Sequence, residues 1–241
     1  MPLDYNNSIP LYLQLKEKIE EKIIKGMFKT KIPSEREIMD EYHVSRSTVR
    51  QAVGELVESG ILVKRAGRGT FIALKPIDDW LGSLSSTTET IERMGMSSGA
   101  KLLRSEVIEL SPELKQETGL DKAFHFKRLR YANYIPIGIE NHYYPISLGE
   151  RINTYDLNKE TLYDLLETEL GIHTFEAEQV IKAGKPIKQD EDLLELEPQS
   201  SVLFTNRKLF DINERFVEYE QAIYRADMYS FKIKLSRKNA K

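Results

Sequence analysis

The spacing of apolar residues divides the chain into two parts with different patterns. Near the N-terminus Leu11, Leu15, Ile19 and Ile23 recur at intervals of four residues, and Gly26 follows them. This is the spacing of an amphipathic helix, with a glycine suited to its end. After about residue 84, long segments with a strand pattern outnumber the helical ones. The pattern therefore predicts a helical N-terminal domain followed by a domain dominated by β-sheet.

Two more helices are predicted close behind the first. Ser34 and Glu37 have the spacing of a capping box, which starts a short helix that ends near His43. Ser45 is suited to cap a third helix over residues 46–59, whose apolar positions keep helical spacing. Only about three residues separate the second helix from the third. The pair is therefore predicted to form a helix-turn-helix.

A basic hairpin is predicted directly after the third helix. Residues 61–65 and 70–74 read as two short strands joined by a turn that contains glycines. A helix-turn-helix followed by such a hairpin is a winged helix, so we assign residues 1–75 to one domain. Residues 76–84 contain a proline, two acids and a glycine, and we expect them to form a linker.

The remaining residues, 85–241, are predicted to form an α+β domain. Long hairpins with few helices indicate an antiparallel sheet, and we expect the helices to cover one side of it. The predicted helices are residues 87–95 and 161–171, and the predicted strands and hairpins are residues 101–110, 125–145, 175–184 and 202–227.

Charge and composition narrow the function classes only in part. The 241 residues carry a net charge of −3, but residues 1–75 hold 13 basic and 10 acidic residues, so the acidic excess lies in the rest of the chain. A basic part joined to an acidic one fits a nucleic-acid-binding module joined to a domain of another kind. The absence of cysteine excludes disulfides and thiolate metal sites. No apolar run is long enough to span a membrane, so we expect a soluble, cytoplasmic protein without a metal or cofactor.

Basic and hydroxyl side chains gather at each element that a winged helix presents to DNA. The second helix of the pair enters the major groove with its N-terminal residues nearest the bases, where arginine can bind guanine and hydroxyl groups can bind phosphate. Each of these side chains could alternatively belong to an ordinary solvated helix face or helix start. The candidates are Ser34 and Arg36 on the second helix, Ser45, Arg46, Ser47, Thr48 and Arg50 on the third, and Lys64, Arg65, Gly67, Arg68 and Gly69 in the wing.

The N-terminal sequence resembles the GntR family of bacterial transcription regulators. The segments "IPLYLQLKEKI", "PSEREIMDEYHVSRSTVRQAVGELVESGIL" and "KRAGRGTFI" follow the family almost position for position, and the second part is similar to the effector-binding UTRA domain of the HutC subfamily. That domain shares its fold with chorismate lyase. The resemblance implies a homodimer on a palindromic operator. It also implies DNA contacts by Arg36, Arg46 and Arg50, assisted by Ser34, Ser45, Thr48, Gly67 and Gly69.

The second domain contains three polar groups that could form a ligand site. Arg128 and Arg130 alternate along a strand, so their side chains share one face and need an anion or an acid such as Glu140 between them. Hydroxyl groups at residues 85–88 precede a helix and could bind a phosphate or carboxylate. Glu218, Glu220, Ala222 and Tyr224 share a face of a late strand. The alternatives are a cross-strand salt-bridge ladder, an ordinary N-cap and a solvated strand face.

The resemblance to HutC proteins joins these groups into one effector pocket. It departs from members that bind an amino-sugar phosphate, because these have a serine–aromatic–threonine run where this chain has Ser86, Thr87 and Thr88, and because Thr161 replaces a serine. We therefore expect a repressor that responds to a small anionic metabolite, with a phosphorylated sugar favoured. The alternatives are a carboxylate or fatty-acid ligand and a chorismate-lyase-like enzyme fused to a DNA-binding domain. The residues implied to line the pocket are Ser86, Thr87, Arg128, Arg130, Glu140, Tyr163, Glu218 and Tyr224.

Overall fold

The chain folds into two compact units, which are described separately. The computed structural model describes residues 3–5, 7–24, 27–28, 31–73 and 76–236. The first unit is built mainly from the segment Met1–Lys75, and the second begins at Pro76. Gly26 and Leu74, which we expected to end a helix and a strand, lie outside the described residues. Among the described helices, none is long and apolar enough to cross a membrane.

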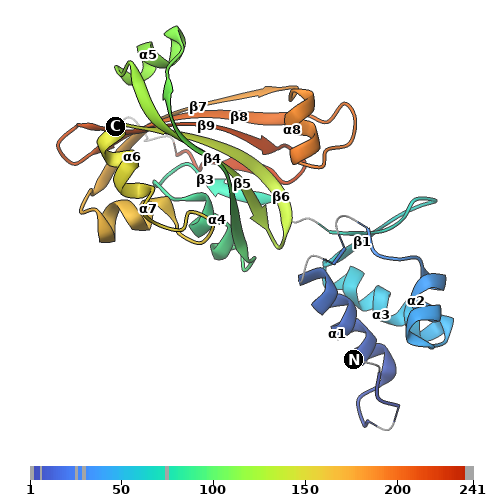
Figure 1. The fold of residues 1–241 in the computed structure, drawn as a ribbon. Coiled ribbons are helices and arrows are strands. Elements are labelled where there is room, and N and C mark those ends of the chain that lie inside the picture. The colour runs from blue at the N-terminus through green and yellow to red at the C-terminus, as the bar shows by residue number, and fades with distance from the viewer. Residues whose placement is uncertain (1–2, 6, 25–26, 29–30, 74–75, 237–241) are drawn as a thin grey trace, which may run out of the picture. The chain divides into compact units, whose positions relative to one another are not determined.

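The first unit is a three-helix domain with a two-stranded hairpin (Figure 1). Its helices are α1 (Leu11–Ile24), α2 (Glu35–Tyr42) and α3 (Arg46–Glu58), and its antiparallel strands are β1 (Leu62–Arg65) and β2 (Gly69–Ile72). The apolar positions that predicted the helices form the core. They include Leu15 and Ile19 of α1, Ile38 of α2, and Val49, Ala52, Val53 and Leu56 of α3, all at most 2% exposed.

Capping places α2 and α3 where the sequence predicts them. The Ser34 hydroxyl accepts a hydrogen bond from the Glu37 backbone N–H, and the Glu37 carboxylate accepts one from the Ser34 backbone N–H, which confirms the capping box. The Ser45 hydroxyl caps α3 by accepting a hydrogen bond from the Thr48 N–H. Between the two helices His43 adopts a left-handed conformation with φ 53°. The tight turn of the helix-turn-helix therefore follows from local side-chain chemistry.

The second unit is built around a six-stranded antiparallel sheet with the order β4-β5-β6-β9-β8-β7 (Figure 1). The hairpin turn between β5 and β6 has Asn133 and Tyr134 at positive φ, as tight two-residue turns require. The strands are β4 (Ser98–Glu109), β5 (Lys122–Ala132), β6 (Ile135–Tyr144), β7 (Thr174–Gly184), β8 (Val202–Asp211) and β9 (Phe216–Arg225).

Helices cover both faces of this sheet, so our expectation that they lie on one side was wrong. Phe126 and Tyr144 pack against α6 (Ile146–Ile152) and against α7 (Leu162–Asp164), which continues into a π-helical turn at Leu165–Glu169. On the opposite face lie α5 (Pro112–Thr118) and α8 (Lys188–Leu193). The reason is visible in β5 and β6, where consecutive residues are buried, so both faces of these central strands need cover.

The predicted linker is also corrected by the structure. Within residues 76–84, Ile77–Trp80 form strand β3, which pairs in parallel with β10 (Tyr229–Lys232). Ile77 and Asp79 are buried in the second unit. A proline, two acids and a glycine suggested a loop, but the strand partner comes from about 150 residues further along the chain and left no local signal. Helix α4 (Thr87–Arg93) follows β3 after a short connection.

Candidate functional site

Helix α3 presents its basic residues to solvent and its apolar residues to the core. Arg46 and Arg50 are exposed, whereas Val49 and Val53 are buried. Arg46 lies 3.4 Å from the Glu35 carboxylate, but its side chain is 72% exposed. An ion pair so open to water contributes little free energy, and it leaves the guanidinium available to a stronger anion. The buried face therefore fixes the helix while the two arginines stay accessible.

The wing and the start of α2 border a common groove. Ser34 and Glu35 form one side of it, and Lys64, Arg65 and Gly67 form the other. Gly67 and Gly69 have φ of 69° and 111°, which a residue with a side chain adopts only with strain. These glycines therefore shape the wing tip, and Arg68 lies between them. Apart from Thr48, which is half-buried, the predicted DNA-contacting residues in these elements are all exposed: Ser34, Arg36, Ser45, Arg46, Arg50, Lys64, Arg65, Gly67, Arg68 and Gly69.

A small cavity lies in the second unit, on the face of the sheet that packs against α4 and α7. Its free volume is about 20 Å³, room for about one water molecule. Its wall contains six of the eight residues predicted for an effector pocket, together with others that were not predicted to line it. The predicted six are Ser86, Thr87, Arg128, Arg130, Glu140 and Tyr163, and the additional polar ones are His142, Thr161, Arg207 and Glu220.

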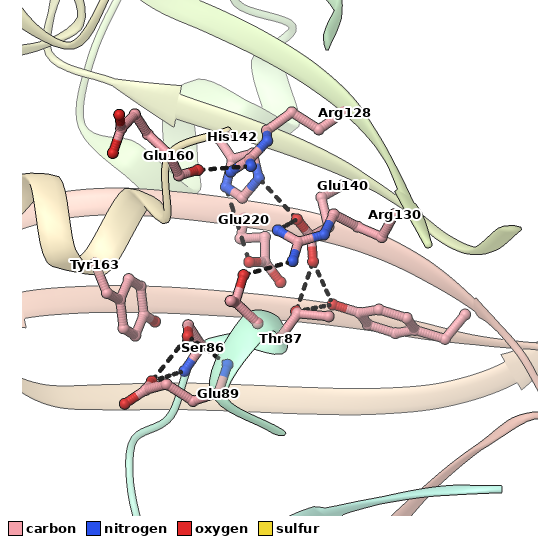
Figure 2. Close-up of polar contacts among 12 residues, drawn as sticks. Ser86, Thr87, Glu89, Arg128, Arg130, Glu140, His142, Glu160, Tyr163 and Glu220 are labelled. Atoms are coloured by element: carbon pink, nitrogen blue, oxygen red, sulfur yellow. Dashed lines mark hydrogen bonds and ion pairs between the residues drawn. The ribbon is translucent and has the colours of Figure 1, made fainter. Parts of the chain in front are cut away.

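Arg128 and Arg130 lie side by side on β5 with incompletely satisfied guanidinium groups (Figure 2). Arg128 donates to the Glu160 carbonyl oxygen at 2.9 Å, and Arg130 donates to the Thr88 hydroxyl at 2.7 Å. Both arginines are at most 3% exposed, and among the described residues no group accepts from either Nε. Burial and the neighbouring Arg130 lower the pKa of Arg128 to about 10, so Arg128 is charged at neutral pH.

Glu140 ties the start of α4 to the sheet. Its Oε1 accepts hydrogen bonds from Thr87 at 2.6 Å and from Tyr224 at 3.0 Å, and its other oxygen lies 3.4 Å from Arg130 (Figure 2). Burial would raise the pKa of Glu140, but the Arg130 charge and the hydrogen bond from His142 hold it well below its ordinary value. Tyr224 therefore acts behind the cavity wall, through Glu140 and Thr87.

His142 carries a buried positive charge between two carboxylates. Its Nδ1 lies 2.6 Å from Glu218, and its Nε2 lies 3.3 Å from Glu140. Burial alone would lower its pKa, but the Glu218 charge and these two hydrogen bonds raise the pKa to about 9. Glu218 also accepts a hydrogen bond from the Tyr144 hydroxyl at 2.6 Å. Glu218 is thus placed behind His142, where it holds the imidazolium.

Glu220 and Arg207 close the cavity from β9 and β8. Burial raises the pKa of Glu220 to about 7 against the opposing charge of Arg207. Arg207 donates to the Tyr163 hydroxyl at 3.1 Å and to the Gln179 side-chain oxygen at 2.6 Å. The sequence had placed Glu220 on one strand face with Glu218, and His142 could have been found in the same way, because it alternates with Glu140 on its strand. Nothing in the sequence around Arg207 pointed to the site.

Ser86 has a mainly structural role in the described conformation. Its hydroxyl and backbone N–H bind the Glu89 carboxylate at 2.8 and 2.7 Å, and its oxygen accepts from the Glu89 N–H, which makes a capping box (Figure 2). The N-cap alternative therefore describes Ser86. The Thr87 hydroxyl instead donates to Glu140, and the Thr88 hydroxyl accepts from Arg130. The two threonines thus contact charged groups of the cavity wall, and Thr87 also lines the cavity itself.

The charges around the cavity do not balance. Arg128, Arg130, Arg207 and His142 are four buried cations, and Glu140, Glu218 and Glu220 are three buried carboxylates. Because the pKa of Glu220 is near 7, part of the negative charge is absent at neutral pH. The cluster thus keeps an excess of positive charge. In a simple salt-bridge ladder between Arg130 and Glu140 the charges would cancel. A buried excess charge is costly unless a counter-ion arrives.

Three of these groups could also approach a metal ion. His142, Glu218 and Glu220 offer ligand atoms that all lie within 4.8 Å of one another. A cation there would have to displace the proton that His142 shares with Glu218. It would also add positive charge beside the guanidinium groups, which disfavours it by Coulomb repulsion. The donor set is therefore better suited to an anion on its arginine side than to a metal.

Comparison with known proteins identifies the family. Residues 11–72 match the bacterial regulatory proteins of the gntR family, and residues 93–230 match the UTRA domain. The HTH-type transcriptional repressor NagR of Bacillus subtilis is 30% identical over 96% of this chain and 97% of its own length. The mannosyl-D-glycerate transport/metabolism system repressor MngR of Escherichia coli is 28% identical over 96% of this chain and 98% of its own length.

The fold is shared with a solved structure over nearly the whole chain. PhnF from Mycobacterium smegmatis matches with a TM-score of 0.65 at 24% identity, over 93% of this chain and all of that chain. The winged helix and the antiparallel sheet with its helices are therefore the expected architecture. The chain belongs to the GntR family of bacterial regulatory proteins, in the HutC subfamily that joins a winged helix-turn-helix to a UTRA domain.

Proposed function

We propose that this protein is a transcriptional repressor that leaves its operator when a small anionic metabolite, a phosphorylated sugar, binds the cavity between β5, β6 and α4. The observation that carries the proposal is the excess of buried cations at this cavity, together with the Nε atoms of Arg128 and Arg130 that have no acceptor among the described residues. An anion would supply both the missing charge and the missing acceptors.

The chemistry of the walls favours a polar ligand over an apolar one. Thr87 offers a hydroxyl group, and Glu220 has an oxygen without a donor among the described residues. Polar atoms of a ligand that reach this cavity would complement these groups, whereas a fatty acyl chain would leave them buried and unpaired. The names of relatives agree with this class, because one is named a mannosyl-D-glycerate transport/metabolism system repressor and others are named probable fructoselysine utilization operon transcriptional repressors. A carboxylate ligand shares the anionic chemistry and remains the second candidate.

The DNA-binding function is proposed for the first unit. Arg46 and Arg50 would read bases from the N-terminal part of α3, Ser45 and Thr48 would support that end of the helix, and Arg36 would bind the phosphate backbone. The wing residues Lys64, Arg65 and Arg68, with Gly67 and Gly69, would approach the adjacent groove. We further propose a homodimer on a palindromic operator, because one α3 covers only a half-site.

A regulator accounts for these features better than an enzyme does. Relatives that match this chain over nearly their whole length are named as repressors. The groups at the cavity already form hydrogen bonds with one another. His142 lies between Glu218 and Glu140, and Arg130 donates hydrogen bonds to Glu140 and Thr88. We propose that this network senses a ligand without transforming it. Because such a regulator acts on bacterial DNA, the proposed location is the cytoplasm.

A continuous series of contacts connects the cavity to β3, the strand that follows the DNA-binding unit in the chain. Glu140 accepts from Tyr224, Tyr224 stacks on Tyr229 with ring centroids 4.2 Å apart, and Tyr229 donates to Asp79 of β3 at 3.0 Å. We propose that ligand binding at Glu140 and Thr87 changes the positions of the residues in this series of contacts, up to Asp79 of β3. The repressor is then released because the ligand prefers the conformation that binds DNA less well.

The test measures operator binding and ligand binding on the same protein. An operator fragment is selected from random DNA with the full chain, and its release is followed by fluorescence anisotropy against a panel of sugar phosphates and carboxylates. We expect at least one anion to release the operator from the wild type and not from Arg130→Ala. Release of the operator from Arg130→Ala at the same concentration, or no release by any anion, would refute the proposal.

A further inference from the structure

A second and larger cavity adjoins the first in the same unit. Its free volume is about 270 Å³, and Arg207 lines both cavities. Ser85, which lines the second, is followed in the chain by Ser86, which lines the first. The first cavity holds about one water, so it has room for the oxygen of an anion but not for the body of a metabolite. In the described structure, the body of the metabolite must therefore lie outside the first cavity.

The walls of the second cavity combine aromatic faces with unpaired polar groups. Trp80 and Phe175 line it, and Phe175 is 69% exposed although it is apolar. Gln179 also lines this cavity, and its side-chain nitrogen is buried and has no acceptor among the described residues. Arg207 and the buried carboxylate of Asp79 complete the polar part. Apolar faces beside hydrogen-bonding groups match a sugar ring, which has C–H groups on its faces and hydroxyls around its edge.

Trp80 is held in position by its neighbours in the chain. It belongs to β3, where it pairs with Lys232 of β10. Its indole lies against Gly82 so closely that a Cβ on this glycine would come within 2.4 Å of the indole Nε1. A side chain at residue 82 would therefore displace the indole without removing it. The aromatic wall is thus preorganised by a glycine, which reduces the ordering cost of binding.

From these observations we infer that the second cavity binds the sugar ring of the effector, against Trp80 and Phe175 and with Gln179 as a donor, while the anionic group reaches past Arg207 to Arg128 and Arg130. This inference rests on the proposed function and adds where the body of the ligand lies. It also makes Trp80 and Gln179 specificity-determining residues. They distinguish sugar phosphates from other phosphates, and the arginines do not.

The experiment compares a ligand that has only the anionic group with ligands that also have the ring. Calorimetric titration of the full chain is carried out with inorganic phosphate and with a panel of hexose and hexosamine phosphates. We expect one sugar phosphate to bind about tenfold or more tightly than inorganic phosphate. The ratio of these two affinities is the readout, and it should fall by about tenfold in Trp80→Ala, in Gln179→Ala and in Gly82→Ala.

Two further variants keep the outcome interpretable. Trp80→Phe retains a ring on the same strand and should keep part of the affinity ratio even if Trp80→Ala disturbs β3. Val180→Ala removes another exposed apolar side chain of β7 that does not line the cavity, and it should leave the ratio intact.

The results separate this inference from the proposed function. Sugar phosphates that bind in an Arg130-dependent way, with a ratio unchanged by the Trp80, Gln179 and Gly82 variants, would overturn the inference and leave the proposed function standing. Absence of binding by every anion in the panel would overturn both.

Discussion

The buried charge on His142 predicts how the stability of the second unit depends on pH. The pKa of this histidine is raised from 6.5 to about 9, whereas in the unfolded chain it is about 6.5. Between these values the folded protein holds a proton that the unfolded chain lacks. The stabilisation is therefore complete below pH 6.5 and is lost as the pH rises through 9, at about 1.4 kcal/mol per pH unit and about 3 kcal/mol in total.

The substitution His142→Gln removes the charge and retains a hydrogen-bonding side chain. At pH 6.5 we expect the variant to be less stable than the wild type by about 3 kcal/mol, because Glu218 and Glu140 lose the cation between them. Between pH 6.5 and 9 the free energy of unfolding of the variant should fall less steeply, by about 1.4 kcal/mol per pH unit. The two stability curves should thus converge near pH 9.

Urea unfolding followed by tryptophan fluorescence is a suitable assay. The chain has one tryptophan, and Trp80 lies in β3, so the signal reports on the second unit. His125→Gln is the matched control. His125 is a buried histidine of the neighbouring strand whose pKa is lowered, chiefly by burial, so it stays neutral in this range. Parallel curves for the wild type and His142→Gln would refute the buried imidazolium, as would an equal loss of pH dependence in His125→Gln.

The other predictions concern DNA binding, coupling and capping. Arg46→Ala and Arg50→Ala should each weaken specific operator binding by about 1–3 kcal/mol in anisotropy titrations, and unchanged affinity would contradict the placement of α3 in the major groove. Tyr229→Phe removes the hydrogen bond to Asp79. It should raise the ligand concentration needed for operator release, while the ligand affinity measured by calorimetry changes little. Release at the wild-type ligand concentration would show that this contact does not couple ligand binding to operator release. Ser34→Ala removes the N-cap of α2 and should lower the stability of the first unit by about 1 kcal/mol in thermal unfolding, and no change would show that the cap is not needed.

Local chemistry made the first unit predictable from the sequence. The capping serines Ser34 and Ser45, the positive-φ glycines of the wing and the helical spacing of apolar residues all act within a few positions of one another. Such interactions leave a pattern in a single sequence. The exposed arginines follow directly, because they occupy the remaining face of α3.

The second unit was predictable only where its contacts repeat along a strand. The alternation of Arg128 with Arg130 correctly placed both side chains on one face, and the structure brings Glu140 to them. Strand β3 and Arg207 were missed for a common reason. Residues 77–80 pair with a strand about 150 positions away, and Arg207 reaches the cavity from β8 through sheet order. Neither depends on nearby residues, so no local pattern marks them.

The most direct test of the central claim is operator release titrated with a sugar phosphate on wild type and Arg130→Ala in parallel. We expect both proteins to bind the operator with similar affinity when no ligand is present, because Arg130 lies in the second unit. We expect Arg130→Ala to need about thirtyfold or more ligand for release, because a buried partner of the anion is gone. Equal release of both proteins by the same ligand concentration would contradict it.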